Sequence, residues 1–223
     1  MASNSPRGPP AKRLLNSVPP TSKIALAFQQ LLFSRALMGR SSRVQAGENR
    51  ARIVQVASDL FRARGIEAVG IADVMKAAGM TQGGFYKHFA SKDALAAEAC
   101  ALAFASAAET WRDVARTAAA EGRDGAAAIA DHYASVRPPS RTCPMIAFAA
   151  DAARRGSGDP VQRAFREGVQ TLFETFADAV QGDPTPEAGE PLRSRFAAMV
   201  GSNLLARSVQ QEAWASRAAP PAS

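Results

Sequence analysis

Residues 79–89, GMTQGGFYKHF, bring an amide, a phenol, an amine and an imidazole together on one short stretch of chain. A glutamine such as Gln82 can form two hydrogen bonds with an adenine base, and a cation such as Lys87 can bind phosphate oxygens. The adjacent glycines, Gly83 and Gly84, each weaken a helix by roughly 1 kcal/mol relative to alanine. That loss is tolerated where a larger side chain would keep the backbone away from a partner. The stretch therefore indicates a surface that contacts nucleic acid at close range.

The chain lacks the residue groupings that catalysis or metal binding requires. Its two histidines, His88 and His132, are expected on different helices, and no clustered carboxylates or nucleophile motif accompany them. Its two cysteines, Cys100 and Cys143, give no disulfide framework or metal-ligand pattern. We therefore predict a protein that is not an enzyme and that holds no cofactor and no metal. Cys100 is interpreted as helix packing, and Arg141 beside Cys143 is a weak basis for an oxidation sensor.

The positive charge is concentrated toward the N-terminus. Residues 1–47 hold seven basic residues and no acidic one, and residues 49–92 hold seven basic against three acidic residues. Residues 93–223 hold 13 basic against 16 acidic residues, a difference of −3. This distribution is typical of a small nucleic-acid-binding head on a near-neutral body. No apolar run approaches the 18 or so residues that a membrane span needs.

Apolar spacing predicts helices, because no proline lies between residues 21 and 137 and no strand-like alternation appears. The first helix has one apolar face, formed by Ile53, Val56, Ala57, Leu60 and Phe61. Gly65 is its natural end. A shorter second helix repeats the spacing with Ile71, Val74, Met75 and Ala78 and ends at Gly79.

A third short helix is expected after Thr81, which is a good N-cap and leaves Phe85 and Phe89 on the inward face. Ser91 caps a fourth helix. The order of helix, short helix, glycine-bearing turn and short helix predicts a helix-turn-helix, whose second helix enters the DNA major groove with its N-terminal residues at the base edges.

Residues 52–95, RIVQVASDLFRARGIEAVGIADVMKAAGMTQGGFYKHFASKDAL, resemble the N-terminal DNA-binding domain of the TetR family of bacterial transcriptional regulators. The matching features keep their order and spacing; they are Ala57, Phe61, Gly65, Asp73, Val74, Ala78, Gly79, Gly83, Phe85, Tyr86, Phe89, Ser91 and Lys92. The rest of the chain matches only in being all-helical and of suitable length. The resemblance implies a homodimer that binds operator DNA near a promoter and releases it when a small molecule enters the C-terminal domain.

The resemblance also implies which side chains face the DNA. Thr81 can touch a phosphate or a thymine methyl, and Lys92 at the start of the fourth helix is expected to contact a phosphate. The expected DNA-binding residues are Arg43, Thr81, Gln82, Gly83, Tyr86, Lys87, His88 and Lys92. Gly70 departs from the family, which has Ser or Thr there to cap the second helix and touch a phosphate. Glycine is an acceptable cap, but that phosphate contact is then in doubt.

The remainder is expected to form an all-α body. Apolar spacing predicts helices over residues 101–122, 125–136, 145–155, 161–180 and 192–216, with a polar linker over 181–191. The expected organisation is a disordered basic extension (1–45), a three-helix helix-turn-helix DNA-binding domain (46–95) and a helical ligand-binding and dimerisation domain (96–218).

Two sets of residues in the body are candidates for binding. The expected effector pocket is formed by Phe104, Trp111, Tyr133, Met145, Phe148 and Phe173, whose apolar character favours an uncharged or aromatic ligand. The expected dimer interface is an isologous four-helix arrangement with Phe165, Phe176, Ala197, Gly201 and Leu205.

The function expected from these observations is a ligand-responsive transcriptional repressor in the bacterial cytoplasm, associated with the nucleoid. Its partners are double-stranded operator DNA, a second copy of itself and a small-molecule effector, with no membrane. One alternative is an all-helical protein whose helix-turn-helix is only structural. Another is a peripheral membrane protein anchored by an amphipathic helix over residues 23–39. The acid-free leader is also typical of a transit peptide, although we favour translation from Met38.

Overall fold

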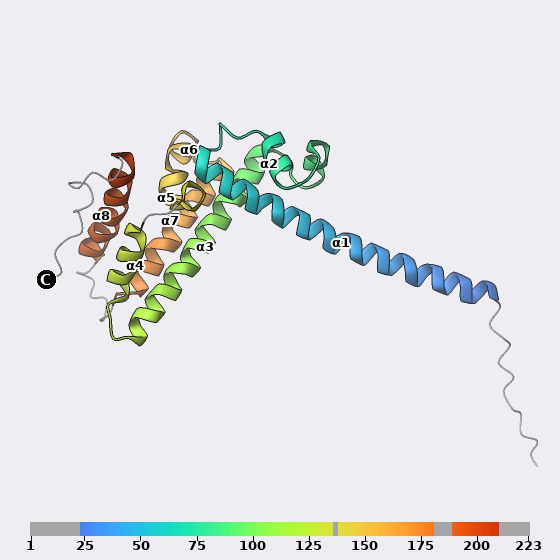
Figure 1. Ribbon diagram of the computed structural model, residues 1–223, viewed down its shortest axis with the longest axis horizontal. Helices are drawn as coiled ribbons and strands as arrows, with labels where there is room; N and C mark the ends of the chain where they lie inside the picture. Colours follow the sequence, from blue (N-terminus) through green and yellow to red (C-terminus); the bar gives the residue numbers. More distant parts are fainter. Residues whose placement is uncertain (1–22, 136–137, 181–188, 210–223) are drawn as a thin grey trace, which may run out of the picture. The chain divides into compact units, whose positions relative to one another are not determined.

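The computed structural model describes the backbone of residues 23–135, 138–180 and 189–209, and the side chains of residues 44–135, 138–180 and 191–209. Every regular element over these residues is a helix (Figure 1). The elements are α1 (Lys23–Arg64), α2 (Ile71–Ala77), η1 (Gln82–Lys87), α3 (Lys92–Ala120), α4 (Gly125–Ala134), η2 (Pro139–Arg141), α5 (Pro144–Ala147), α6 (Ala149–Ala153), α7 (Pro160–Asp178) and α8 (Gly189–Ser208). The all-α class expected from the sequence is confirmed.

The chain divides into two compact units, Met1–Ala46 and Gly47–Ser223. Helix α1 begins in the first unit and ends in the second. The structure differs here from the expected disordered extension, because residues 23–45 are helical. No proline follows Pro20 within this stretch, so nothing obliges the helix to break before Gly65. Within the second unit, residues 47–95 are called the head and residues 96–209 the body.

The head forms around one apolar core shared by the end of α1, α2, η1 and the start of α3. Its buried side chains are Ile53, Val54, Ala57, Phe61, Ile66, Val69, Val74, Met75, Ala78, Phe85, Phe89 and Leu95. Each large side chain buried in this way contributes about 1.5–3 kcal/mol. Gly65 ends α1 as expected, with φ +83°, a backbone conformation that favours glycine. Gly79 closes α2 with φ +73°.

The segment expected as a third α-helix is a 3₁₀-helix, η1, over Gln82–Lys87. Its amides bond three residues back: Gly84 N–H donates to the Thr81 carbonyl at 3.0 Å and His88 N–H to the Phe85 carbonyl at 2.8 Å. Two adjacent glycines make a long α-helix unfavourable, and a short 3₁₀ turn satisfies the same backbone groups. Thr81 precedes the helix with extended backbone, but its hydroxyl makes no capping bond, so the expected side-chain cap is absent.

Helices α3 and α7 lie side by side and form the main packing contact of the body (Figure 1). They approach closely because Gly168 of α7 has no side chain. A Cβ atom there would lie 2.2 Å from the Phe104 ring of α3. Ser91 caps α3 as expected, since its hydroxyl accepts the Ala94 amide proton at 3.0 Å.

The helix expected over residues 145–155 is interrupted. Pro144 begins α5, and a second short helix, α6, starts after Phe148, whose ring is fully buried. Asp159 caps α7 by accepting the Val161 amide proton at 2.7 Å.

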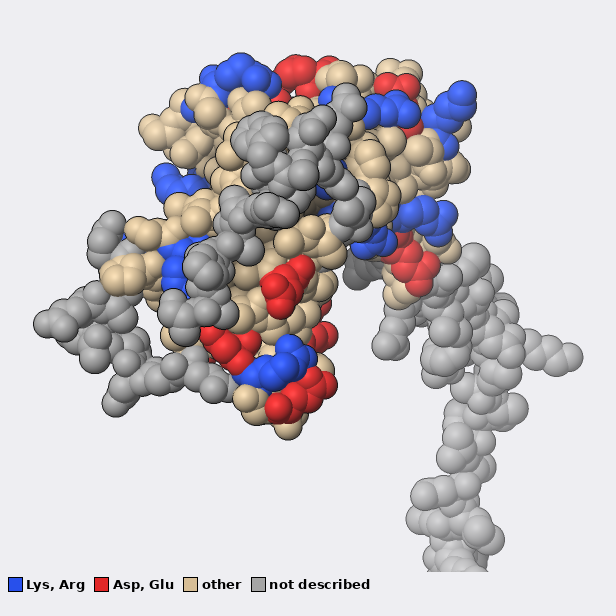
Figure 2. Space-filling model, turned by 60° about the vertical axis from the view of Figure 1, so that its left-hand side comes forward, with Lys and Arg blue, Asp and Glu red and all other residues tan. Residues whose placement is uncertain are grey.

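Helix α8 packs on α4, α5 and α7. The Asn203 side-chain amide donates to the Tyr133 carbonyl at 2.5 Å, and Arg207 donates to the Thr142 hydroxyl at 2.8 Å. On the face drawn in Figure 2, acidic side chains gather at the lower end, level with the α3–α4 connection in Figure 1, and basic ones are more frequent higher up.

Candidate nucleic-acid interface

The recognition segment, defined as residues 81–89, has an apolar side and a polar side. Phe85 is fully buried and Phe89 is 3% exposed, with their ring centres 5.6 Å apart. Tyr86 is 72% exposed, and its ring meets the edge of Phe85 at 5.1 Å. Gln82 and Lys87 are also exposed. The two phenylalanines thus hold the segment to the head while an amide, a phenol and an amine remain available to a partner.

The fold of the head does not require a glycine at position 83. A Cβ atom added to Gly83 would meet nothing within 4 Å, and its φ is not positive. A Cβ at Gly84 would lie 3.7 Å from the Met75 side chain, an ordinary contact. Gly83 therefore relieves no clash within the described part of the chain, and its lack of a side chain leaves the backbone open to a partner.

Thr81 and His88 stand at the two ends of η1. Thr81 is exposed and has its hydroxyl available on the outer surface. His88 ends the helix, is half-buried, and its ring centre lies 6.4 Å from that of Phe89. His88 therefore presents only part of its ring outward, less than the sequence suggested.

Arg50 of α1 contacts the end of the recognition segment. Its position in the sequence gave no indication of this contact. Its guanidinium carbon lies 4.7 Å from the centre of the Phe89 ring. The same guanidinium donates to the carboxylate of Glu98 on α3 at 2.6 Å. Arg50 thus joins α1, α3 and the end of the recognition segment, within reach of both an aromatic face and a carboxylate.

Asp73 takes over the capping of α2, since Gly70 has no side chain. The Gly70 amide donates to the Asp73 carboxylate at 2.9 Å, and the Gly70 carbonyl accepts from the Asp73 and Val74 amides. Asp73 therefore satisfies the Gly70 amide as the second half of a capping box does, but no hydroxyl is available there for a phosphate.

Lys92 and Arg43 are the two basic residues outside the recognition segment that were expected to contact DNA. Lys92 is half-buried, and its ammonium donates to the Glu67 carbonyl at 3.5 Å. It lies at the first position of α3 as expected, already near a backbone acceptor of the head. The side chain of Arg43 lies outside the described residues.

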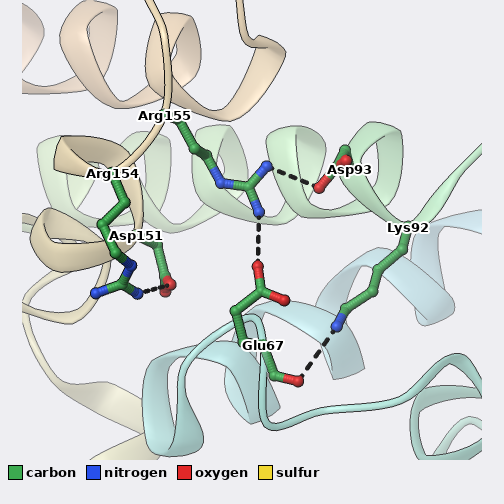
Figure 3. Close-up of a pocket in the computed structure, with 6 residues that line it drawn as sticks. All are labelled: Glu67, Lys92, Asp93, Asp151, Arg154 and Arg155. Atoms are coloured by element: carbon green, nitrogen blue, oxygen red, sulfur yellow. Dashed lines mark hydrogen bonds and ion pairs between the residues drawn. The ribbon is translucent and has the colours of Figure 1, made fainter.

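A charged cavity of about 410 Å³ lies between the head and the body (Figure 3). It is lined by Glu67, Lys92, Asp93, Asp151, Arg154 and Arg155. Arg155 lies after α6 and donates to carboxylates of the head, of α3 and of the α7 cap. Nothing in the sequence indicated this cluster, because its members are far apart in the chain.

Asp159, which Arg155 also contacts, has a shifted pKa. Desolvation raises the pKa of Asp159, but the hydrogen bonds that it accepts from the Val161 amide and from Arg155 outweigh that effect. The pKa of Asp159 is therefore lowered, and its charge is favoured in the folded protein.

The residues expected to form an effector pocket lie in the core of the body. Phe104, Trp111, Tyr133, Met145 and Phe148 are each at most 5% exposed. The Trp111 and Tyr133 rings meet edge to face at 5.7 Å. The sixth residue, Phe173, is half-buried and its ring centre lies 5.4 Å from that of Phe196. All six side chains belong to or pack against the same apolar core, and their role in ligand binding stays a prediction.

The residues expected at a dimer interface do not share one environment. Phe176 is 2% exposed and its ring packs 5.7 Å from Phe196, so it belongs to the core of its own chain and the expectation for it is wrong. Phe165 packs edge to face on Phe104. In contrast, Ala197 and Leu205 are exposed on α8.

Part of the exposed surface of α8 is apolar. Leu204 and Leu205 are 46% and 49% exposed, and a Cβ at Gly201 would meet nothing within 4 Å.

Two further kinds of site are absent from the described residues. Among these residues, no group of His, Cys, Asp or Glu side chains could hold a metal ion. No helix in the same part of the chain is long and apolar enough to cross a membrane.

Comparisons with known proteins agree on the head. The model of the family "Bacterial regulatory proteins, tetR family" matches residues 53–99. The regulator AcrR of Shigella flexneri is 38% identical over 61 residues, which is 27% of this chain and 28% of AcrR. The regulator TtgR of Pseudomonas putida is 38% identical over 55 residues, 25% of this chain and 26% of TtgR. The match therefore spans only about a quarter of each of these relatives.

Solved structures extend the similarity to the body. A TetR transcriptional regulator from Chloroflexus aurantiacus is 29% identical, with a TM-score of 0.61 over 78% of this chain and 91% of that one. The reduced form of Escherichia coli NemR has a TM-score of 0.60 over 77% of this chain and 93% of NemR, at 17% identity. The second similarity concerns the fold alone.

Proposed function

Because the chain belongs to the TetR family of bacterial regulatory proteins, we propose that it is a DNA-binding transcriptional regulator. In this proposal it is a repressor that leaves its operator when a small molecule binds. The observation that carries the proposal is the two-sided recognition segment. Phe85 and Phe89 anchor it, and Gln82, Tyr86 and Lys87 remain exposed above them.

Each exposed group has a role that its chemistry supports. Gln82 in the first turn of η1 pairs with a base edge, for which an amide has the necessary donor and acceptor. Lys87 and Tyr86 bind phosphate oxygens and fix the register on the duplex. The bare backbone at Gly83 lets η1 come close to the groove, which is why a glycine stands where the fold does not need one.

DNA release follows from a change in the body. An effector enters among the aromatic side chains around Trp111 and Tyr133, whose contact joins α3 to α4. Binding favours one arrangement of α3, and the first turn of α3 carries Lys92 at the head. A coupling of about 1–3 kcal/mol between the two sites changes operator occupancy usefully.

A second copy of the chain binds along the exposed surface of α8. Small residues at Ala197 and Gly201 let a partner helix approach, and Leu204 and Leu205 offer apolar surface. A two-fold arrangement presents two recognition segments to two half-sites of one operator.

The first experiment is fluorescence anisotropy with labelled DNA from upstream of the protein's own gene, at several salt concentrations. The wild type is compared with a Gln82→Ala, Lys87→Ala variant. A matched control changes Gln170 and Arg166 to alanine, one amide and one cation that are exposed on α7. The proposal predicts sequence-dependent binding that the first variant loses and the control retains. The salt slope should fall by about 1 in the first variant.

Binding that is equally weak on every sequence, and equal in both variants, would overturn the proposal. An effector screen belongs after this measurement, because release can be followed only on an operator that is bound.

A further inference from the structure

We propose that Arg155 is a positioning residue that holds the head on the body in the orientation in which the recognition segment meets DNA. This inference rests on the proposed function. Arg155 lies in the connection between α6 and α7, far in sequence from the residues expected to touch DNA. It touches no base or phosphate in this proposal and acts only through the placement of the head.

The guanidinium of Arg155 joins three separate elements (Figure 3). Its Nη2 lies 3.1 Å from a carboxylate oxygen of Glu67, in the head between α1 and α2. Its Nη1 lies 2.8 Å from Asp93 in the first turn of α3 and 3.1 Å from Asp159, the N-cap of α7. One side chain thus joins two parts of the head, the Glu67 loop and the first turn of α3, to the start of α7 in the body.

Arg155 itself is shielded from water, although two of its partners are not. Its side chain is only 14% exposed and that of Asp159 is 22% exposed, whereas those of Glu67 and Asp93 are 73% and 52% exposed. The ion pair with Asp159 is therefore screened least by water. If Arg155 were removed, the carboxylates of Glu67, Asp93 and Asp159 would lose the cation that they share. Breaking a partly buried ion pair from one side leaves such uncompensated charge, and the joint between head and body would open.

A second contact, between Asp151 and Ile66, also joins this segment of the body to the head. Asp151 of α6 is 5% exposed, and its carboxylate accepts the Ile66 amide proton at 3.2 Å, immediately after α1 ends. The other oxygen of Asp151 accepts from Arg154 at 2.8 Å. The segment from Asp151 to Asp159 therefore contacts the head at two consecutive residues, Ile66 and Glu67.

Neighbouring Arg154 offers a matched control. It carries the same charge at the adjacent position, but its side chain is 65% exposed and its ion pair is with Asp151, three residues earlier in its own segment. Replacing Arg154 or Arg155 by alanine changes the net charge equally at nearly the same place. A difference between the two variants then reports the bridge to the head and not the long-range attraction of DNA.

The test measures operator and shuffled-sequence DNA binding by anisotropy for the wild type, Arg155→Ala, Arg154→Ala and Glu67→Gln. Arg155→Ala is expected to lower the ratio of operator to shuffled-DNA affinity about tenfold, within the usual range for coupling between sites. Arg154→Ala should leave the ratio within about twofold of the wild type, because Asp151 still accepts the Ile66 amide proton in that variant. The salt slope should stay unchanged in Arg155→Ala, whereas loss of a phosphate contact would reduce it by about 1.

Glu67→Gln separates geometry from charge, because it removes a negative charge and by simple attraction would strengthen DNA binding. The proposal expects it to lower the same ratio, about threefold, since Asp93 and Asp159 still hold Arg155. It also keeps the test valid if Arg155→Ala proves unfolded by circular dichroism. Equal ratios for Arg155→Ala and Arg154→Ala, or a raised ratio in Glu67→Gln, would overturn the inference. A wild type that prefers no sequence would instead remove the proposed function on which the inference rests.

Discussion

The guanidinium carbon of Arg50 lies 4.7 Å from the centre of the Phe89 ring, so a cation of α1 covers the aromatic residue that ends the recognition segment. Glu98 holds the same guanidinium from the other side at 2.6 Å. The polar surface of the recognition segment therefore depends on a residue nearly forty positions earlier in the chain.

Replacing Arg50 by alanine is expected to lower the free energy of unfolding by about 1 kcal/mol. The cation–π contact at an exposed site contributes about 0.5–1 kcal/mol, and a surface ion pair contributes about 0–1 kcal/mol. Urea unfolding followed by circular dichroism measures the change. Glu98→Gln is the control, since it removes only the ion pair. If both variants lose the same amount, the ring contact contributes nothing.

Gly83→Ala should separate folding from DNA binding. The added methyl group meets no atom of the chain, so the melting temperature is expected to stay the same or rise slightly. Operator affinity should fall about tenfold, equivalent to about 1.4 kcal/mol, because the backbone is held away from its partner. Anisotropy and thermal melting on the same preparation test both parts. Unchanged affinity would mean that no partner approaches this backbone closely.

Gly168→Ala is expected to lower the free energy of unfolding by about 1–3 kcal/mol, because its Cβ would lie 2.2 Å from the Phe104 ring. Gly158→Ala is the control, since a Cβ there would meet nothing within 4 Å. Adding Phe104→Leu to Gly168→Ala should restore part of the loss. A Gly168→Ala protein as stable as the control would show that α3 and α7 can separate without cost.

The two cysteines should react very differently with a thiol reagent at pH 8. Burial raises the pKa of the Cys100 thiol to about 12, so almost none of it is thiolate at that pH. Cys143 is half-buried at the start of α5. One thiol is expected to react in the native protein and a second only after denaturation, and Cys143→Ser should remove the first. Rapid modification of Cys100 in the folded Cys143→Ser variant would contradict this expectation.

A double change of Ala197 and Ala198 to arginine should make the protein monomeric in sedimentation velocity. Both alanines are exposed on α8, and two arginines there would fill the surface that a partner helix needs. Ala119 and Ala120, exposed near the end of α3, provide a control with the same added charge. If the α8 variant remains a dimer, the interface lies elsewhere.

Much of the head could be predicted from the sequence, because its signals are local. The apolar spacing that ends at Gly65, the Ser91 cap of α3 and the inward positions of Phe85 and Phe89 all depend on residues a few positions apart. The 3₁₀ geometry of η1 was missed because a cap and an apolar pair at i and i+4 indicate an α-helix, whereas η1 ends at Lys87, before Phe89.

The parts that could not be predicted depend on distant contacts. Arg155 is 88 positions from Glu67 and 62 from Asp93, and nothing in the local pattern of any of the three indicates the others. Phe176 was assigned to a dimer interface because apolar spacing on α7 does not distinguish a face buried in its own chain from one that contacts a partner. Only packing against Phe196 identifies which face is internal.

The close contact between Gly168 and Phe104 bears on how far a small tilt of α3 would move Lys92. Lys92 begins α3 twelve residues before Phe104, a helix length of about 18 Å. If α3 tilted by about 5° around this contact, Lys92 would move by about 1.6 Å, given that length. A hydrogen bond tolerates only a few tenths of an ångström. The angle between two packed helices in the body is thereby translated into the presence or absence of single polar contacts at the head.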